Sequence, residues 1–118
     1  MKTTLTIEES ARLIELGVDA KLASHKESNF YNGITSDEFK VYYLFTLTDL
    51  FSILPKEIEI EGEKEDLNIV MDNYGALVGY PKFHEKHGCA FVAPELIDAL
   101  YQLLIWAIDH NYVKTEKK

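Results

Sequence analysis

The segment over residues 94–111 constrains the fold most strongly, because apolar residues cover most of the surface that it would present as a helix. At about 100° per residue, its polar residues form a single narrow stripe: Glu95, Asp98, Gln102 and Asp109. Apolar residues occupy most of the remaining surface: Leu96, Ile97, Ala99, Leu100, Leu103, Leu104, Trp106, Ala107 and Ile108. Pro94 suits the first helical position, where its missing N–H needs no partner. We therefore predict a helix that the rest of the chain, or a second subunit, must enclose.

Length and composition indicate one globular domain. The chain has 118 residues, of which 47% are hydrophobic and 27% are charged. This length and composition are typical of a domain with a single core, and the hydrophobic fraction is too high for a disordered chain. We predict one domain over residues 1–113 and a frayed basic tail over residues 114–118.

The single cysteine, Cys89, cannot form an intramolecular disulfide, which favours a reducing compartment. The first nine residues have no apolar run of the signal-peptide type, and the longest apolar tract, over 99–108, is too short to span a bilayer. We therefore predict a cytoplasmic protein that does not enter a membrane. The net charge of −8, without a basic stripe, argues against direct nucleic-acid binding.

Two capping boxes predict two further helices. Thr6 is followed three residues later by Glu9, and a periodic apolar face continues as far as Gly17, which predicts a helix over 7–16. Thr46 and Asp49 repeat the spacing and predict a second helix over 47–54, which Pro55 ends. The polar stretch over 25–37 has no periodicity and is predicted to be a loop.

Alternating apolar residues predict the strands. Ile58 and Ile60 alternate with glutamates, as in a strand with one buried and one solvated face. A turn over 62–66 then leads to a returning strand with Leu67, Ile69 and Met71 facing inward. Further strands are predicted over 39–45, 76–80 and 89–92, and a polar, non-helical connection over 82–88. Together these elements predict an α+β fold, in which a mainly antiparallel sheet of four to five strands packs against the long C-terminal helix, with two shorter helices flanking it.

Three segments carry a resemblance to known sequences: residues 7–19, residues 46–55 (Thr-Leu-Thr-Asp-Leu-Phe-Ser-Ile-Leu-Pro) and residues 91–112 with their tryptophan-bearing helix. Together they resemble small uncharacterised proteins of Bacteroidetes bacteria and of their phages and mobile elements. The resemblance covers helix caps and core positions, and it omits the loop around 29–37. It implies a bacterial or phage origin and carries no activity, cofactor or catalytic residue.

One short cluster has the residue types of a metal site. His84, His87 and Cys89 lie close together in the sequence, and imidazole and thiolate groups are the usual ligands of zinc. The histidines are three residues apart rather than four, and the set is one ligand short of a structural site. We therefore interpret them as loop histidines beside a buried cysteine, and we predict no cofactor. A small metal-dependent or thiol enzyme centred on these residues is the alternative.

Two surfaces are candidates for protein binding. Glu57, Glu59 and Glu61 belong to a crowded acidic segment, which either is simply solvated or imitates a nucleic-acid backbone toward a basic partner. On the C-terminal helix and just after it, Tyr101, Ile105 and Tyr112 extend the apolar surface, and an exposed member would favour self-association. Function itself is not determined by the sequence. We favour a non-enzymatic interaction module that binds another protein, or a second copy of itself, through these acidic and aromatic residues.

Overall fold

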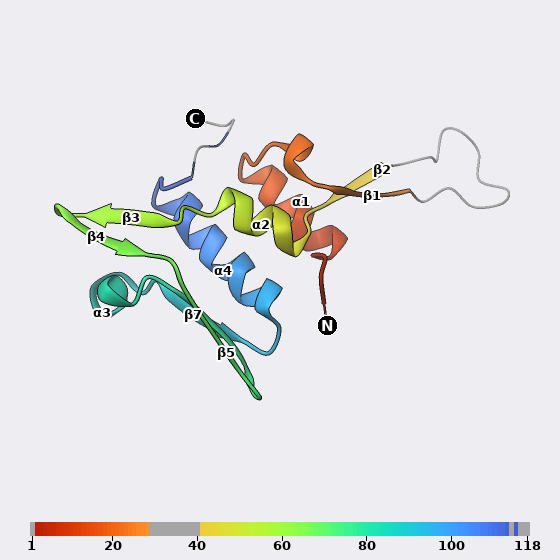
Figure 1. Cartoon of the computed structure of the whole chain (residues 1–118). Coiled ribbons are helices and arrows are strands. Elements are labelled where there is room, and N and C mark those ends of the chain that lie inside the picture. Colours follow the sequence, from red (N-terminus) through yellow and green to blue (C-terminus); the bar gives the residue numbers. More distant parts are fainter. Residues whose placement is uncertain (1, 29–40, 114, 116–118) are drawn as a thin grey trace, which may run out of the picture.

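The computed structural model describes residues 2–28, 41–113 and 115. Its architecture is α+β, and its sheets are all antiparallel (Figure 1). In chain order the elements are α1 (Ile7–Glu15), the 3-10 turn η1 (Ala20–Leu22), β1 (His25–Ser28), β2 (Val41–Leu44), α2 (Leu47–Ile53), β3 (Glu57–Ile60), β4 (Glu63–Asp66), β5 (Asn68–Asp72), β6 (Gly75–Gly79), the 3-10 turn η3 (Pro81–Phe83), α3 (His84–His87), β7 (Ala90–Ala93) and α4 (Leu96–Asp109).

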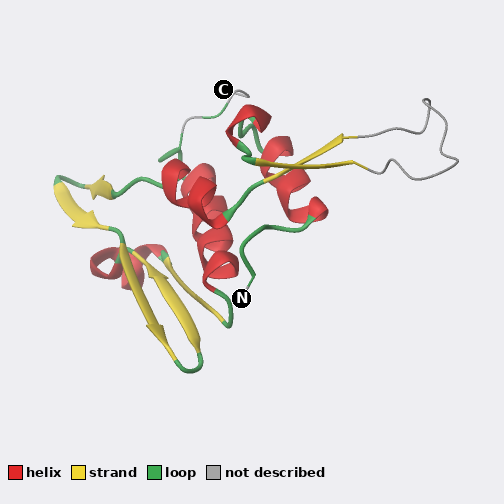
Figure 2. Cartoon of the chain, turned by 45° about the vertical axis from the view of Figure 1, so that its right-hand side comes forward, coloured by secondary structure: helices red, strands yellow, loops and turns green. Residues whose placement is uncertain are grey.

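Helix α4 lies at the centre of the fold. It packs against β6 and β7 on one side and against α2 on another, and Figures 1 and 2 show it between the three-stranded sheet and helices α1 and α2. The apolar residues that defined the predicted helix are all buried: Leu96, Ile97, Ala99, Leu100, Leu103, Leu104, Trp106, Ala107 and Ile108. The prediction of an enclosed helix is therefore confirmed.

The start of α4 differs from the prediction. Pro94 is not the first helical residue, because the chain is still extended at Glu95, which is the N-cap. Glu95 uses its carboxylate to accept the backbone N–H of Lys2 at 3.2 Å, and it does not cap its own helix. The N-terminal segment therefore joins the beginning of α4 through this contact.

Both predicted capping boxes are present. The Thr6 hydroxyl accepts from the backbone N–H of Glu9 at 3.1 Å, and the Glu9 carboxylate accepts from the backbone N–H of Thr6 at 3.0 Å. Thr46 and Asp49 make the same reciprocal pair at 3.2 and 2.8 Å. These bonds satisfy backbone donors that a helix leaves without partners, which is why the sequence positioned α1 and α2 correctly.

The prediction of one four- to five-stranded sheet is wrong. The strands form three separate sheets, β1 with β2, β3 with β4, and β5–β6–β7 in that order. The second of these sheets is separate from the third because residues 63–66, predicted to be a turn, form β4 and pair with β3. Glu61 and Gly62 have positive φ angles of 53° and 83°, so they close a two-residue turn that folds β4 directly onto β3. β3 is therefore paired with β4, and β5 pairs with β6 instead.

Strand β5 is exposed along its whole length, contrary to the prediction that Ile69 and Met71 face inward. Its register with β6 places these two residues on the same sheet face as the buried Ala76 and Val78. Helix α4, however, makes its main sheet contacts with β6 and β7, and it leaves most of β5 uncovered. The alternation was thus read correctly, but the helix does not extend over the edge strand.

The loop predicted over 25–37 is wrong in its first part, because residues 25–28 form β1 and pair with β2. The remainder lies outside the described residues, as does most of the predicted tail over 114–118. Within the described part of the chain, none of the helices has the length and apolar character needed to cross a membrane. The cytoplasmic location stays a prediction.

The central position of α4 predicts a strong effect of truncating its buried side. Leu103→Ala should lower the free energy of unfolding by about 2–5 kcal/mol, because Leu103 is fully buried and its loss leaves a cavity. Urea unfolding followed by circular dichroism measures this change. Gln102→Ala is the matched control on the exposed side of the same helix and should change stability by less than about 0.5 kcal/mol. Equal effects of the two substitutions would contradict the enclosed position of α4.

Candidate functional site

The predicted metal-site residues lie around α3 and the start of β7. Residues 84–87 form a short helix, so the prediction of a non-helical connection is wrong there. The helix follows directly on η3, whose buried Phe83 anchors this segment to the core. The side chains of His84 and His87 lie outside the described part of the structure. Among the side chains that are described, no three of His, Cys, Asp and Glu gather closely enough to hold a metal ion.

Cys89 is in the core, as predicted for a small apolar side chain. It is fully buried, and its Sγ donates to the backbone carbonyl oxygen of Tyr80 at 3.3 Å. Burial raises the pKa of the Cys89 thiol above its ordinary value, because the thiolate would be desolvated. A nucleophilic cysteine needs the opposite conditions, namely access to solvent and a stabilised thiolate. The geometry of Cys89 therefore gives thiol chemistry no support.

The carboxylates of the acidic segment lie on the β3–β4 hairpin. Glu57, Glu59 and Glu61 are exposed, while Ile58 between them is buried, as the alternation predicted. Across the hairpin Glu59 lies opposite Lys64, but Glu57 lies opposite Asp66. These carboxylates face water, and the arrangement is that of a solvated acidic surface.

The aromatic candidates on the C-terminal side are only partly exposed. Tyr101, Ile105 and Tyr112 all pack against the hydrophobic core. Tyr112 stacks on Trp106 with ring centroids 5.4 Å apart, and His110 stacks on the same tryptophan at 4.5 Å. Burial raises the pKa of Tyr101. The structure thus does not bring these three side chains together as a bare apolar patch.

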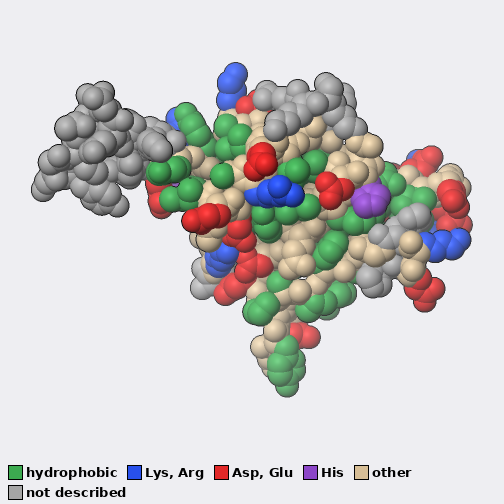
Figure 3. Space-filling view, turned by 180° about the vertical axis from the view of Figure 1, so that it is seen from behind, with side chains coloured by type: hydrophobic (Ala, Val, Ile, Leu, Met, Phe, Trp, Pro, Cys, Tyr) green, Lys and Arg blue, Asp and Glu red, His purple; other side chains and the backbone are tan. Residues whose placement is uncertain are grey.

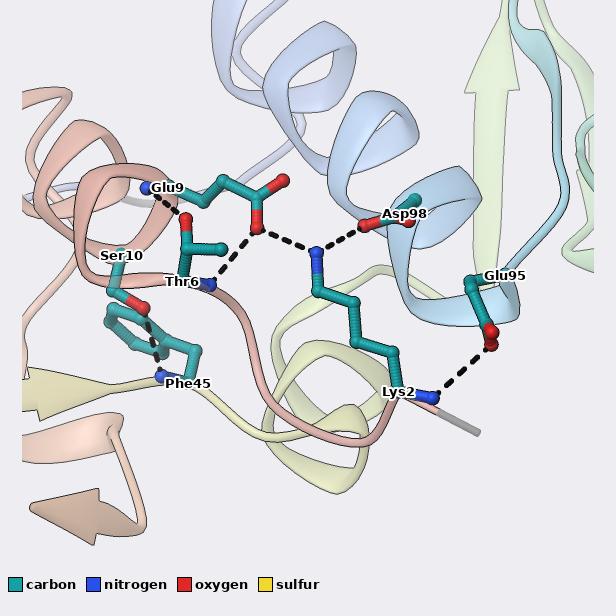
Figure 4. A network of polar contacts seen from close by, with 7 residues as sticks. All are labelled: Lys2, Thr6, Glu9, Ser10, Phe45, Glu95 and Asp98. Carbon is teal, nitrogen blue, oxygen red and sulfur yellow. Dashed lines mark hydrogen bonds and ion pairs between the residues drawn. The ribbon is translucent and has the colours of Figure 1, made fainter.

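Two polar networks hold the N-terminal half in place. Figure 4 shows the first, in which the Lys2 ammonium contacts Glu9 at 2.9 Å and Asp98 at 2.7 Å. In the same region Ser10 accepts the backbone N–H of Phe45 with its hydroxyl oxygen at 3.2 Å. Burial alone would lower the pKa of Lys2, but its contacts with the two carboxylates outweigh burial and raise it. The network therefore links α1 to α4 through the side chain of Lys2.

The second network centres on Asp49, a nearly buried residue of α2. Its carboxylate accepts from the backbone N–H groups of Ser24 at 2.7 Å and Thr46 at 2.8 Å, and from the Ser24 hydroxyl. Burial by itself would raise the pKa of Asp49, but these hydrogen bonds outweigh burial and lower it. The residue fastens the segment before β1 to α2, which makes it a structural group.

The most exposed apolar surface lies on the three-stranded sheet. Nine large hydrophobic residues are exposed in the described part of the chain, and six of them belong to this sheet and its hairpin turn. These six are Ile69, Val70, Met71, Tyr74, Leu77 and Val92. In Figure 3 hydrophobic side chains occupy the end of the hairpin, which projects from the body of the molecule. Exposed apolar side chains gathered in this way mark interaction surfaces.

The arrangement of these residues follows from the strand register. Val70 lies opposite Leu77, and Leu77 lies opposite Val92, so the three form one row across the sheet on the side away from α4. Their exposed fractions are 55%, 37% and 67%. Tyr74, at the turn beyond the row, is 92% exposed. We call Val70, Leu77, Val92 and Tyr74 the exposed sheet face.

Sequence reasoning missed this surface, although a signal was present. The predicted strands placed Ile69, Met71, Ala76 and Val78 on the inward side, which left Val70 and Leu77 at outward positions. In the strand over 89–92 the predicted burial of Cys89 puts Val92 on the outward side as well. Apolar residues at outward positions of three neighbouring strands mean that the second face is apolar too. The alternation of the strands, followed on both faces instead of one, therefore indicates the exposed sheet face.

Comparison of the chain with protein families, with curated proteins and with solved structures finds no significant match. The resemblance to small Bacteroidetes and phage proteins therefore stays a prediction. The candidate site is supported by its own geometry.

The burial of Cys89 predicts how the thiol reacts. In the native protein a thiol reagent such as dithionitrobenzoate should leave Cys89 unmodified, because the sulfur has no exposed surface and its pKa is raised. The same reagent should titrate one thiol per chain in strong denaturant. Absorbance at the wavelength of the released thiolate measures both. Rapid reaction of the native protein would overturn this description and revive the thiol-enzyme alternative.

The Asp49 network predicts a specific loss of stability in acid. Because the pKa of Asp49 is lower in the folded than in the unfolded state, its carboxylate stabilises the fold above its ordinary pKa. That contribution is lost as the pH falls through the folded-state pKa. Asp49→Asn should therefore cost about 1–3 kcal/mol at pH 7 and less at pH 3.

Urea unfolding at pH 7 and pH 3 measures this difference. Asp109→Asn, on the exposed end of α4, is the control and should alter stability little at either pH. An Asp49→Asn variant with the same loss of stability at both pH values would show that the charge of Asp49 is not what the network uses.

Proposed function

We propose that the protein is a non-enzymatic interaction module that binds another protein through the exposed sheet face. The observation that carries the proposal is the exposure of Val70, Leu77 and Val92, which form an apolar row on the side of the sheet away from α4. Tyr74 adds a nearly fully exposed aromatic ring at the end of the hairpin. Aromatic and aliphatic side chains of this kind form the anchors of protein interfaces.

The local charge favours a partner with a basic rim. The chain that leads into β5 is the β3–β4 hairpin, whose residues 57–66 contain six carboxylates and one lysine. Glu57, Glu59 and Glu61 are exposed on it. Complementary charge at the edge of an apolar contact steers association and selects partners more than it adds affinity. In this proposal the acidic hairpin has that steering role, and the sheet face supplies the contact.

The alternative of a metal-dependent or thiol enzyme gains no support from the described residues. Cys89 is sealed in the core and its raised pKa disfavours the thiolate. The polar network around Lys2 connects α1 with α4, and the network around Asp49 connects α2 with the segment before β1. By contrast, the exposed sheet face contributes little to the core of the described chain, which is the reason for preferring the binding function.

The proposal can be tested by photo-crosslinking in the native host. A photoreactive phenylalanine analogue placed at Tyr74 should form an adduct with a different protein, whereas the same analogue at Thr48, exposed on α2, should not. Val92→Asp, combined with the analogue at position 74, should reduce that adduct at least about tenfold, because it places a charge in the apolar row.

Mass spectrometry identifies the adducts, and circular dichroism verifies that the Val92→Asp protein is folded. Adducts of equal yield from positions 74 and 48 would contradict the proposal. So would a full yield from position 74 in the Val92→Asp protein.

A further inference from the structure

The outer edge of β5 is the feature from which a further inference follows. The backbone N–H of Tyr80 donates to the carbonyl oxygen of Cys89 at 3.0 Å, so the backbone of Tyr80 points toward the β7 side. Backbone direction alternates along a strand, so Leu77 and Gly79 point the other way, toward β5. Their register partners are Val70 and Asn68.

The same alternation determines what the outer edge of β5 offers. Because Asn68, Val70 and Asp72 direct their backbone groups to β6, Ile69 and Met71 direct theirs away from it. Among the described residues, no backbone group of another segment bonds to Ile69 or Met71 on this outer side. An edge with free N–H and C=O groups beside apolar side chains is a template for pairing with another strand.

The free edge is bounded at both ends. On the N-terminal side, the backbone N–H of Leu67 donates to the carbonyl oxygen of Lys56 at 2.8 Å, so that position is occupied. On the C-terminal side the chain turns at Asp72, whose carboxylate accepts from the backbone N–H groups of Tyr74 and Gly75. The stretch that remains is residues 68–72, with Val70 at its centre.

We propose that a second copy of this chain pairs with β5 along this edge, antiparallel and about a two-fold axis at Val70. In this register Ile69 of one copy lies opposite Met71 of the other, and both direct their backbone groups into the new ladder. Val70 lies opposite Val70 of the second copy. The ladder then uses the whole free edge of both copies, as an isologous interface requires.

The extent of the free edge and the residues along it favour this register over its two neighbours. About Val70, Asn68 lies opposite Asp72 of the second copy, and an amide can donate to a carboxylate. Moving the axis to Ile69 would instead require Asp72 of the second copy to lie opposite Asp66, a position that Glu57 of β3 already occupies. Moving it to Met71 would leave Asn68 beyond the pairing strand. Of these registers, the one centred on Val70 pairs residues 68–72 fully.

The pairing also covers the side chains that α4 leaves exposed. Ile69 and Met71 lie on the α4 side of the sheet, but α4 mainly contacts β6 and β7 and leaves them exposed. In the dimer, Ile69 of each copy would contact Met71 of the other. On the opposite side, the two Val70–Leu77–Val92 rows would join into one continuous row across six strands. The inference therefore deepens the proposed function and rests on it in this respect: the dimer doubles the apolar surface offered to a partner.

Disulfide trapping tests the register directly. In a non-hydrogen-bonded antiparallel pair the two Cα atoms lie about 4.5 Å apart, within the range that a disulfide spans. Val70→Cys should therefore form a covalent dimer on mild oxidation. Val92→Cys is the matched control, because it lies in the same row and is more exposed but is distant from the axis. The native Cys89 is buried and does not compete.

We expect at least tenfold faster dimer formation from Val70→Cys than from Val92→Cys, measured on non-reducing gels. Equal rates would show random collisions and would overturn the proposed register. Each variant is checked by circular dichroism, and only folded protein is compared.

A charge exchange at the same position tests the interface without covalent chemistry. Val70→Lys and Val70→Glu should each be monomeric in light scattering, because identical charges meet at the axis. An equimolar mixture should form a 1:1 heterodimer, while the unaltered protein should dimerise with rising concentration. An unaltered protein that remains monomeric up to millimolar concentration would overturn the inference. That outcome leaves the Tyr74 adduct with a different protein unaffected, so failure of the dimer and failure of the proposed binding function are distinguishable.

Discussion

The enclosure of α4 is the constraint on which the rest of the structure depends. Burying one large apolar side chain is worth about 1.5–3 kcal/mol, and α4 carries nine buried residues within fourteen. No single sheet face can cover a helix that is apolar on so many sides. The fold solves this by placing β6 and β7 on one side and α2 on another. The Lys2 contacts to Glu9 and Asp98 then join α1 and α4 through the N-terminal segment.

The same arrangement creates the candidate site. Helix α4 covers β6 and β7 but mostly leaves β5 beyond its reach, so Ile69 and Met71 stay exposed although they lie on its side of the sheet. On the other side, none of the described helices covers the row of Val70, Leu77 and Val92. The three-stranded sheet is therefore apolar on both faces and covered on part of one. The exposed sheet face lies on the side of the sheet that α4 does not contact, and the free edge of β5 lies where no described strand pairs with it.

The parts of the fold that local chemistry determines could be predicted from the sequence. Thr6 with Glu9, and Thr46 with Asp49, positioned α1 and α2, because a capping box is a contact within a few residues. The buried face of α4 followed from its periodicity. Tertiary choices could not be predicted in this way. Whether residues 63–66 turn or pair with β3 depends on the positive φ angles of Glu61 and Gly62, which the composition of the segment did not reveal.

The candidate site was harder to predict than the fold for a related reason. The interaction residues expected on the C-terminal side, Tyr101, Ile105 and Tyr112, are apolar enough to bind a partner, but they pack against the core of the same chain. Which apolar residues stay exposed depends on where α4 ends its cover, and this is a property of the assembled layers. Outward apolar residues on neighbouring strands were the one local sign of it.

Amide hydrogen exchange, resolved residue by residue in dilute protein, tests the central claim most directly. If α4 is enclosed and the edge of β5 is free, amides over residues 100–108 should exchange only through global unfolding. The amide of Val70, bonded to β6, should be protected, while those of Ile69 and Met71 exchange quickly. Fast exchange along α4, under conditions where the sheet stays protected, would contradict the account.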